Sequence, residues 1–208
     1  MDVKRIKVKS CGYVHCRSCF YTAQDIIQQY SEYDFEVGIN KLYGEIDSGV
    51  WAISYLLSMY KYKPKDFMLF SSTNIYVNET IMSLNDISQL SCYMDASHPI
   101  FSSKKSIREL VEKGISTSKL RCSSENIKTL FGIDNDRFER PLKETGNEIF
   151  KSMAAIGYSF DKELFCFPWL SEQRFDYYKN NITQVLNTLE CLNRIVIFPI
   201  GKYGIISN

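Results

Sequence analysis

The sequence predicts an α/β fold with a mainly parallel core sheet, antiparallel strands at the start of the chain and a helical insert. Two short runs, 163–167 and 194–200, are almost continuously apolar, which is typical of parallel strands buried on both faces. Helical segments alternate with these runs. The chain opens at 3–9 with alternating apolar and basic residues, which predicts a half-exposed strand. These observations favour a single domain over 1–208.

Composition places the chain among ordered globular proteins. Its 208 residues are 45% hydrophobic, which is enough to form a buried core. Basic and acidic residues balance at 25 and 24, without the basic excess that is typical of nucleic-acid binding. The sequence has no apolar run of about 18 residues and no signal-peptide core. We therefore expect a cytoplasmic protein that binds no nucleic acid, does not insert into the membrane, and reaches its inner face only through a partner.

The first half of the chain is expected to hold mostly strands around one helix. Residues 51–59 carry apolar side chains near helical period and no glycine or proline, so they predict a helix. Gly12 predicts a turn, and Asn78 with Glu79 predicts a turn or a strand edge. Residues 23–30 are expected to be a short helix or irregular. The other expected strands are 13–21, 35–43, 67–70, 74–82 and 90–94.

The second half is expected to alternate helices with the two buried strands. Ser106 is followed three residues later by Glu109, which is the pattern of a capping box, and Gly114 is the expected end of that helix. The last strand is expected to pair with 204–206. Further helices are predicted at 123–132, 147–158 and 171–193.

Between an expected strand and an expected helix, the sequence has the glycine frame of a phosphate-binding loop. Such a loop reads G-x-x-x-x-G-K-[ST]: backbone N–H groups surround the phosphates, the lysine neutralises them and the hydroxyl binds Mg²⁺. Gly44 and Gly49 stand at the required spacing, but Val50 occupies the lysine position and Trp51 the hydroxyl position. The backbone N–H groups of Gly44, Ser48 and Gly49 are therefore expected to offer at most a weak site for ATP or ADP.

In the order and spacing of its segments, nearly all of the chain resembles the ATP-binding subunit of ABC transporters. Residues 93–96 resemble the family's Tyr-Val-Pro-Gln segment, with the glutamine position at Ala96 or Asp95. Residues 100–110 are similar to the family's entry into its helical subdomain. The resemblance implies a P-loop NTPase core. It also implies a β-subdomain opening at about 1–43, a helical subdomain at about 96–150 and the core in the remainder.

The resemblance also identifies positions where the family's functional residues are replaced. In the signature segment, Thr145 and Gly146 keep a hydroxyl and one glycine. The two carboxylates that follow the family's buried strand fall on Pro168 and Trp169, and the switch histidine falls on Ile200. Together with the two replacements in the phosphate loop, these losses predict a pseudo-ATPase with no catalytic residues, no metal and no firmly bound cofactor.

Two explanations remain for the tryptophans that stand at these positions. Trp51 and Trp169 either fill the core where relatives hold nucleotide, or form an apolar surface for a partner protein.

Such a protein is expected to act by binding another protein. The expected partner is an active ABC ATPase subunit, a membrane permease, peptide maturation or export machinery, or a second copy of the chain. Two alternatives remain: an active ATPase with unrecognised motifs, and an enzyme with a separate site. Candidates for the separate site are Asp95 with His98, and the cysteine cluster Cys11, Cys16 and Cys19 with His15, which could also hold a metal although free thiols are the default.

Overall fold

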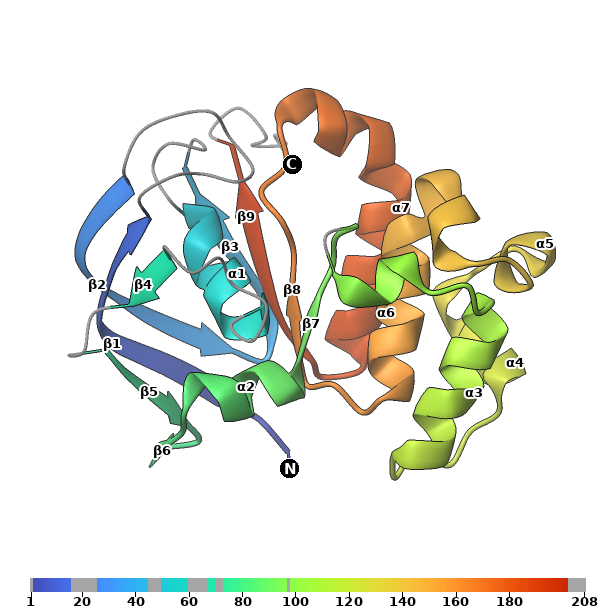
Figure 1. Ribbon diagram of the computed structural model, residues 1–208, viewed down its shortest axis with the longest axis horizontal. Coiled ribbons are helices and arrows are strands. Elements are labelled where there is room, and N and C mark those ends of the chain that lie inside the picture. Colours follow the sequence, from blue (N-terminus) through green and yellow to red (C-terminus); the bar gives the residue numbers. More distant parts are fainter. Residues whose placement is uncertain are drawn as a thin grey trace.

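The computed structural model describes residues 2–15, 26–44, 50–59, 67–69, 73–96 and 98–201, which form two sheets with helices between and beside them (Figure 1). The antiparallel sheet has the order β2-β1-β5-β6, and β4 also pairs with β1. Its strands are β1 (Arg5–His15), β2 (Ile26–Glu36), β4 (Phe67–Leu69), β5 (Asn74–Val77) and β6 (Thr80–Ile81). The parallel sheet has the order β3-β9-β8-β7, built from β3 (Gly38–Tyr43), β7 (Ser91–Tyr93), β8 (Leu164–Cys166) and β9 (Ile195–Ile200).

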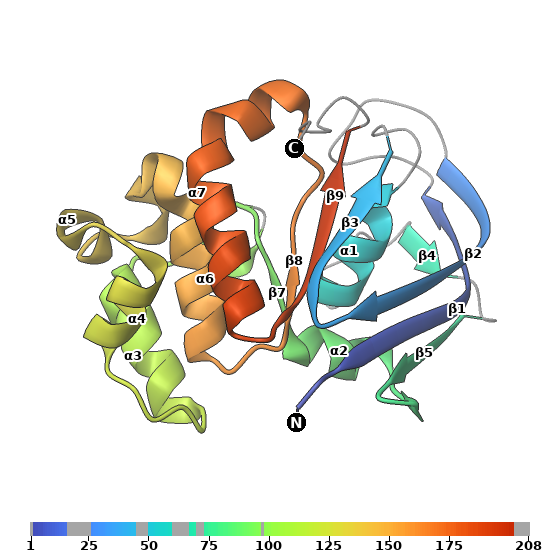
Figure 2. The ribbon, with the colours of Figure 1, turned by 180° about the vertical axis from the view of Figure 1, so that it is seen from behind.

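The helices form layers on both faces of the parallel sheet. Helix α1 (Val50–Met59) lies between the two sheets, and α6 (Ile149–Ser159) and α7 (Glu172–Cys191) cover the opposite face (Figure 2). Helix α2 (Leu84–Leu90) packs against α1. The outer helices are α3 (Ile107–Thr117), α4 (Ser124–Phe131) and α5 (Asn135–Phe138), with the short 3-10 turns η3 (Pro99–Ser102), η4 (Leu142–Glu144) and η5 (Gly146–Glu148). Within the described ranges, no helix is both long and apolar enough to span a membrane.

The parallel sheet separates two hydrophobic cores. Along β8, Leu164 and Cys166 face the core that contains α1, whereas Phe165 between them faces the core that contains α6 and α7. Strand β9 alternates in the same way, since successive side chains of a strand point to opposite faces. All six residues of β9 are buried. The prediction of strands buried on both faces is therefore confirmed.

The chain passes from one sheet to the other at Gly38, although the sequence predicts one strand over 35–43. Strand β2 ends at Glu36, and Gly38 has a φ of 104°, which few residues other than glycine adopt. The Gly38 N–H donates to the carbonyl of Arg194 at 3.0 Å, which begins the pairing of β3 with β9. This turn places residues 38–43 in the parallel sheet, directly before the glycine frame.

Several local predictions are confirmed. Ser106 and Glu109 form the reciprocal capping box of α3, with the Glu109 N–H donating to Ser106 Oγ at 3.2 Å and the Ser106 N–H donating to Glu109 Oε2 at 2.7 Å. Helix α4 ends at Gly132, whose φ of 60° is the left-handed conformation expected of a helix-ending glycine. Asn78 and Glu79 have positive φ values of 47° and 68° and form the turn between β5 and β6.

Other local predictions are wrong, and tertiary contacts explain why. Residues 23–30 were expected to be a short helix or irregular, but 26–30 belong to β2 because their backbone pairs with β1. Gly12 lies within β1, at a shift in register where the strand continues instead of turning. Gly114 lies inside α3, where the helix packs so closely on Ser159 of α6 that an added Cβ would meet Ser159 Oγ at 2.0 Å. Helix α2, capped by Ser83, was not predicted.

Candidate functional site

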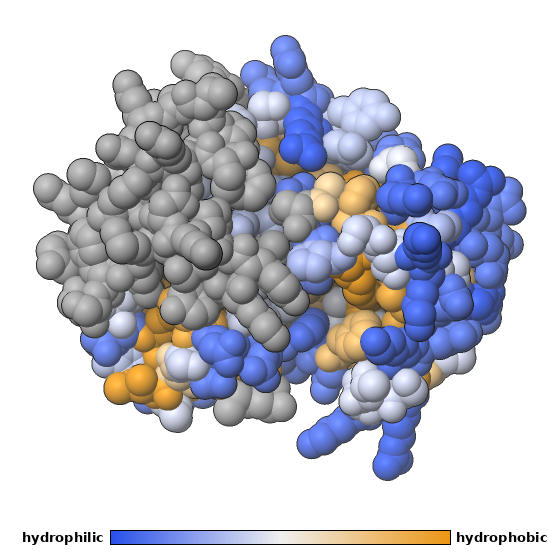
Figure 3. All heavy atoms as spheres, viewed as in Figure 1, coloured by the Kyte–Doolittle hydropathy of each residue, from blue (hydrophilic) through white to orange (hydrophobic). Residues whose placement is uncertain are grey.

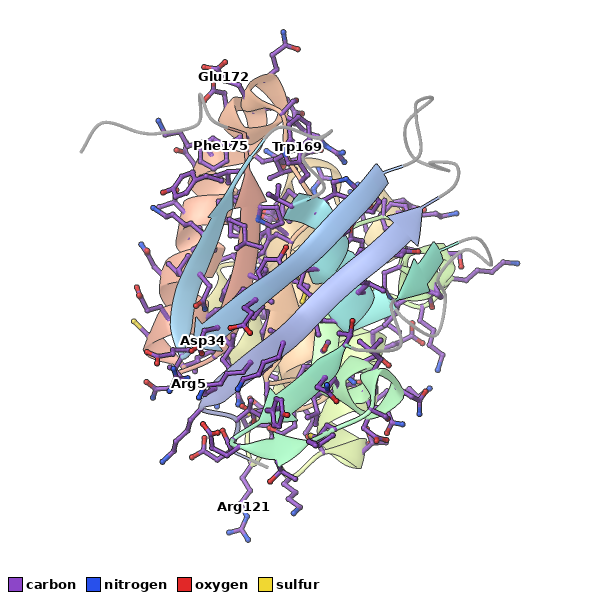
Figure 4. All side chains as sticks on the ribbon, turned by 90° about the vertical axis from the view of Figure 1, so that its left-hand side faces the viewer. Arg5, Asp34, Arg121, Trp169, Glu172 and Phe175 are labelled. Atoms are coloured by element: carbon purple, nitrogen blue, oxygen red, sulfur yellow. The ribbon has the colours of Figure 1, made fainter. Side chains whose placement is uncertain are left out.

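Three of the sequence-predicted positions meet at the carboxyl end of the parallel sheet. The Gly44 N–H donates to the carbonyl of Ile200 at 3.0 Å, and Leu170 forms an isolated parallel bridge with Ile200. Trp169 precedes Leu170 and lies at this end of the molecule (Figure 4). Carboxyl ends of parallel strands are where open α/β folds bind ligands, so the predicted positions lie where a site would be expected.

Trp169 makes a direct link across this edge. Its indole Nε1–H donates to the carbonyl oxygen of Gly44 at 3.0 Å, joining positions 125 residues apart in sequence. The ring is half-buried and packs against the core that contains α1. A large aromatic ring with one polar atom therefore lies directly beside the entry to the glycine frame.

The start of α1 is apolar. Val50 is half-buried, and Trp51 is 4% exposed with its ring edge-on to Tyr55 at 6.2 Å between centroids. Trp51 is therefore a core residue rather than part of an exposed surface. Ser48 and Gly49 lie outside the described residues, so their part of the phosphate-loop prediction stays a prediction.

The end of β8 is tied to α1 by a bond that sequence reasoning missed. Ser54 Oγ donates to the carbonyl of Phe167 at 2.5 Å, and Ser54 is fully buried. Pro168 follows Phe167 and is buried as well. A serine on the apolar face of a predicted helix was the available signal, because a buried hydroxyl requires a partner.

Asp95 and His98 are joined through the backbone, with the His98 N–H donating to the Asp95 carbonyl at 3.0 Å. Arg174 Nη2 of α7 lies 3.7 Å from Asp95 Oδ1. His98 Nδ1 accepts a hydrogen bond from the Ile100 N–H at 3.2 Å and caps η3. Burial, with a smaller contribution from Lys162, lowers the pKa of His98 to about 4, so the ring is neutral near pH 7. A neutral ring that caps a turn does not need a catalytic explanation.

The signature-like segment lies in the turn before α6. Thr145 is 1% exposed, and its Oγ1 donates to the Leu142 carbonyl at 2.7 Å, so this hydroxyl is held by the local backbone. Gly146 is exposed, with a φ of 59°. Helix α6 begins only at Ile149, because η5 intervenes and Glu148 makes no side-chain cap. Gly146 therefore does not directly open the helix.

Among the predicted motif positions that the structure describes, only Asp95 carries a titratable side chain. The other predicted positions near this end of the sheet are Val50, Trp51, Pro168, Trp169 and Ile200. Phosphoryl transfer depends on cations, metal ligands and a water-orienting group placed around the phosphates, and none of these five side chains supplies one. Cys16 and Cys19 lie outside the described residues, and Cys11 is described only through its place in β1.

No protein-family model matches this chain, and no curated protein matches it in sequence. Solved structures match it in fold. A putative ABC transporter ATP-binding protein from Pyrococcus furiosus superposes with a TM-score of 0.62 at 12% identity, over 98% of this chain and 93% of that protein. A bacterial Atm1-family ABC exporter with ATP bound gives a TM-score of 0.62 at 11% identity, over 100% of this chain but 36% of the exporter chain. The chain thus has the fold of ABC transporter ATP-binding proteins, as the resemblance implies.

Proposed function

We propose that this protein is a non-hydrolysing relative of ABC transporter ATP-binding subunits that acts by binding a partner protein. The observation that carries the proposal is the hydrogen bond from the Trp169 indole to the Gly44 carbonyl. It places an apolar ring between the end of β8 and the glycine frame. In the resembling family, that position carries a carboxylate that activates water.

The other replacements also remove groups that ATP hydrolysis requires. A valine and a buried tryptophan at the start of α1 cannot supply the phosphate-neutralising cation or the Mg²⁺ ligand. The nonpolar Pro168 and Ile200 add neither a metal ligand nor a proton acceptor. Because phosphoryl transfer is accelerated mainly by positioning and charge stabilisation, losing all of these groups is expected to abolish hydrolysis rather than slow it moderately.

Weak nucleotide binding is a separate part of the proposal. Backbone N–H groups can hold phosphate without a lysine, although the main counter-charge is lost. Gly44, Ser48 and Gly49 would supply those groups. We expect ATP or ADP to bind weakly, without turnover.

The proposed partner is inferred from the proteins that share this fold. The two similar structures are described as an ABC transporter ATP-binding protein and an ABC exporter. We propose that this chain pairs with an active ATPase subunit, with a membrane permease or with a second copy of itself, in the cytoplasm at the inner face of the membrane.

Purified protein tests the first part of the proposal. ATP hydrolysis is followed by phosphate release in the presence of Mg²⁺, and binding is followed by calorimetry. We expect no turnover in the wild type. The Gly49→Ala variant is the matched control, because only turnover that this variant abolishes would come from the glycine frame. Turnover of that kind would overturn the proposal.

The partner is tested separately. Size-exclusion chromatography with light scattering distinguishes a monomer from a homodimer of the purified chain. Co-expression with the candidate ATPase and permease subunits of the same cell then tests for stable complexes. A monomer that co-purifies with none of them would contradict the proposed mode of action.

A further inference from the structure

A cavity lies away from the candidate site. Its volume is about 280 Å³, and it is bounded by the end of α1, α2, β7, η3 and the second half of α6. One wall is apolar and includes Ile100, Met153, Ile156 and Phe160. Figure 3, viewed from the same side as Figure 1, shows hydrophobic residues gathered near the middle of the face that it draws.

The cavity is distinct from the glycine frame. Ser58 lines it and lies eight positions after Val50 on α1. At 1.5 Å per residue this is about 12 Å along the helix axis. Ser91, at the amino end of β7, also lines the cavity, whereas the candidate site lies at the carboxyl end of the sheet.

One positive charge enters the cavity. Lys162 follows α6, and its Nζ donates to the carbonyl of Gln89. A lysine ammonium carries three N–H groups, so two remain after this bond. Lys162 is half-buried, and burial lowers its pKa. Among the described residues that line the cavity, none is acidic.

The other polar groups of the wall are neutral. Burial raises the pKa of the Cys92 thiol to about 12, so no thiolate balances the lysine. Ser91 Oγ lies 2.6 Å from the Ile87 carbonyl and 2.9 Å from the Leu57 carbonyl, so the backbone holds its hydroxyl. His98 is neutral near pH 7, as described above.

We propose that this cavity binds a small monocarboxylate with a compact apolar body. The carboxylate would pair with Lys162, and the apolar body would contact Met153 and Phe160. A single cation matches one negative charge better than a phosphate dianion, which is usually met by several donors and cations. The volume is at the lower end of ligand pockets, so it selects a ligand of about ten heavy atoms rather than a nucleotide.

The probe is 3-phenylpropanoate, with the neutral 3-phenylpropanamide as its matched control. Binding is followed by NMR of protein labelled at the methionine methyl groups and the histidine nitrogens. The chain has two histidines, so His15 serves as the internal reference for His98. We expect saturable shifts at Met153 and His98 with a Kd on the order of 1 mM, typical of a ligand of this size. The amide should bind at least about tenfold more weakly.

Two variants test the charge. Lys162→Met should weaken 3-phenylpropanoate binding by about tenfold or more and leave amide binding unchanged. Lys162→Gln keeps a donor for the Gln89 carbonyl but loses the charge, so it should show the same loss in a protein with its local fold intact. Absence of saturable shifts up to 10-fold above the expected Kd would overturn the proposal. Equal binding of acid and amide, or unchanged acid binding in both variants, would do so as well.

Discussion

Around Gly44, the carboxyl end of the parallel sheet is joined by backbone bonds and apolar side chains, whereas helices α3 and α4 are joined by caps and ion pairs. At the sheet, Gly44 bonds to Ile200 and accepts from the Trp169 indole. On the outer helices, Arg108 of α3 reaches Glu125 of α4 at 2.5 Å and Glu139 at 2.7 Å.

The difference shows where this chain uses its charges. The Arg108 contacts connect three segments of the outer layer, and the guanidinium also lies over the Phe138 ring at 4.9 Å. At the carboxyl end of the parallel sheet, by contrast, the side chains of Val50 and Pro168 are uncharged. The proposed loss of ATP chemistry is consistent with these uncharged side chains.

The largest expected effect is at Trp51. Trp51→Ala should lower the free energy of unfolding by about 3–5 kcal/mol, because it removes a buried aromatic ring and leaves a cavity between the sheets. Urea unfolding measures the loss. Trp51→Phe, which keeps most of the apolar volume, should cost clearly less. A small loss in Trp51→Ala would show that this side of the site is not packed as a core.

His98, in the loop after β7, makes stability depend on pH. Its pKa of about 4 is below the usual 6.5, so the unfolded state binds the proton more readily and stability falls as pH decreases. Above pH 6.5 protonation of His98 does not reduce the free energy of unfolding. By pH 4 it should lower that free energy by about 3 kcal/mol. His98→Asn keeps an acceptor for the Ile100 N–H without titrating in this range. Urea unfolding from pH 7 to 4 should therefore show a smaller decline in the variant, and parallel curves would contradict the assignment.

The capping box tests the outer helices. Ser106→Ala removes the acceptor for the Glu109 N–H and should destabilise the protein by about 1 kcal/mol. The melting temperature should fall by about 2–4 °C, given the chain length. Ser116→Ala is the control, because Ser116 is exposed and its hydroxyl bonds only to the carbonyl of Lys113 within the same helix. Equal losses in the two variants would mean that the cap contributes nothing of its own.

The outer helices were the easier region to predict from sequence. The caps at Ser106 and Gly132 are signals contained within a few residues, and the apolar runs of β8 and β9 indicate burial on both faces. Strand β2 was missed because its conformation depends on pairing with β1 rather than on its own pattern. The α/β class and the order of segments were therefore accessible, whereas several boundaries were not.

For the candidate site, the sequence indicated which residues to consider but not the contacts between them. Spacing singled out Gly44, Trp169 and Ile200 as motif positions, and the structure brings these three together. The sequence could not show that the indole of Trp169 bonds to Gly44, because 125 residues separate them and the contact exists only after the sheet has formed. A tryptophan near a predicted site was a partial signal, since a buried indole N–H usually finds an acceptor.

The indole bond is expected to contribute about as much as the capping box. Trp169→Phe keeps an aromatic ring but removes the N–H that reaches Gly44, and should cost about 1 kcal/mol, which is the size of one hydrogen bond between neutral groups. Urea unfolding gives the stability change, and calorimetry with ATP shows whether the loosened edge now admits nucleotide. Trp169→Leu, which loses the whole ring, should cost more and is the reference for packing. If Trp169→Phe is as stable as the wild type, the ring alone closes this edge and the hydrogen bond adds nothing. If either variant gains ATP binding, the tryptophan excludes nucleotide from a backbone cradle that is otherwise competent.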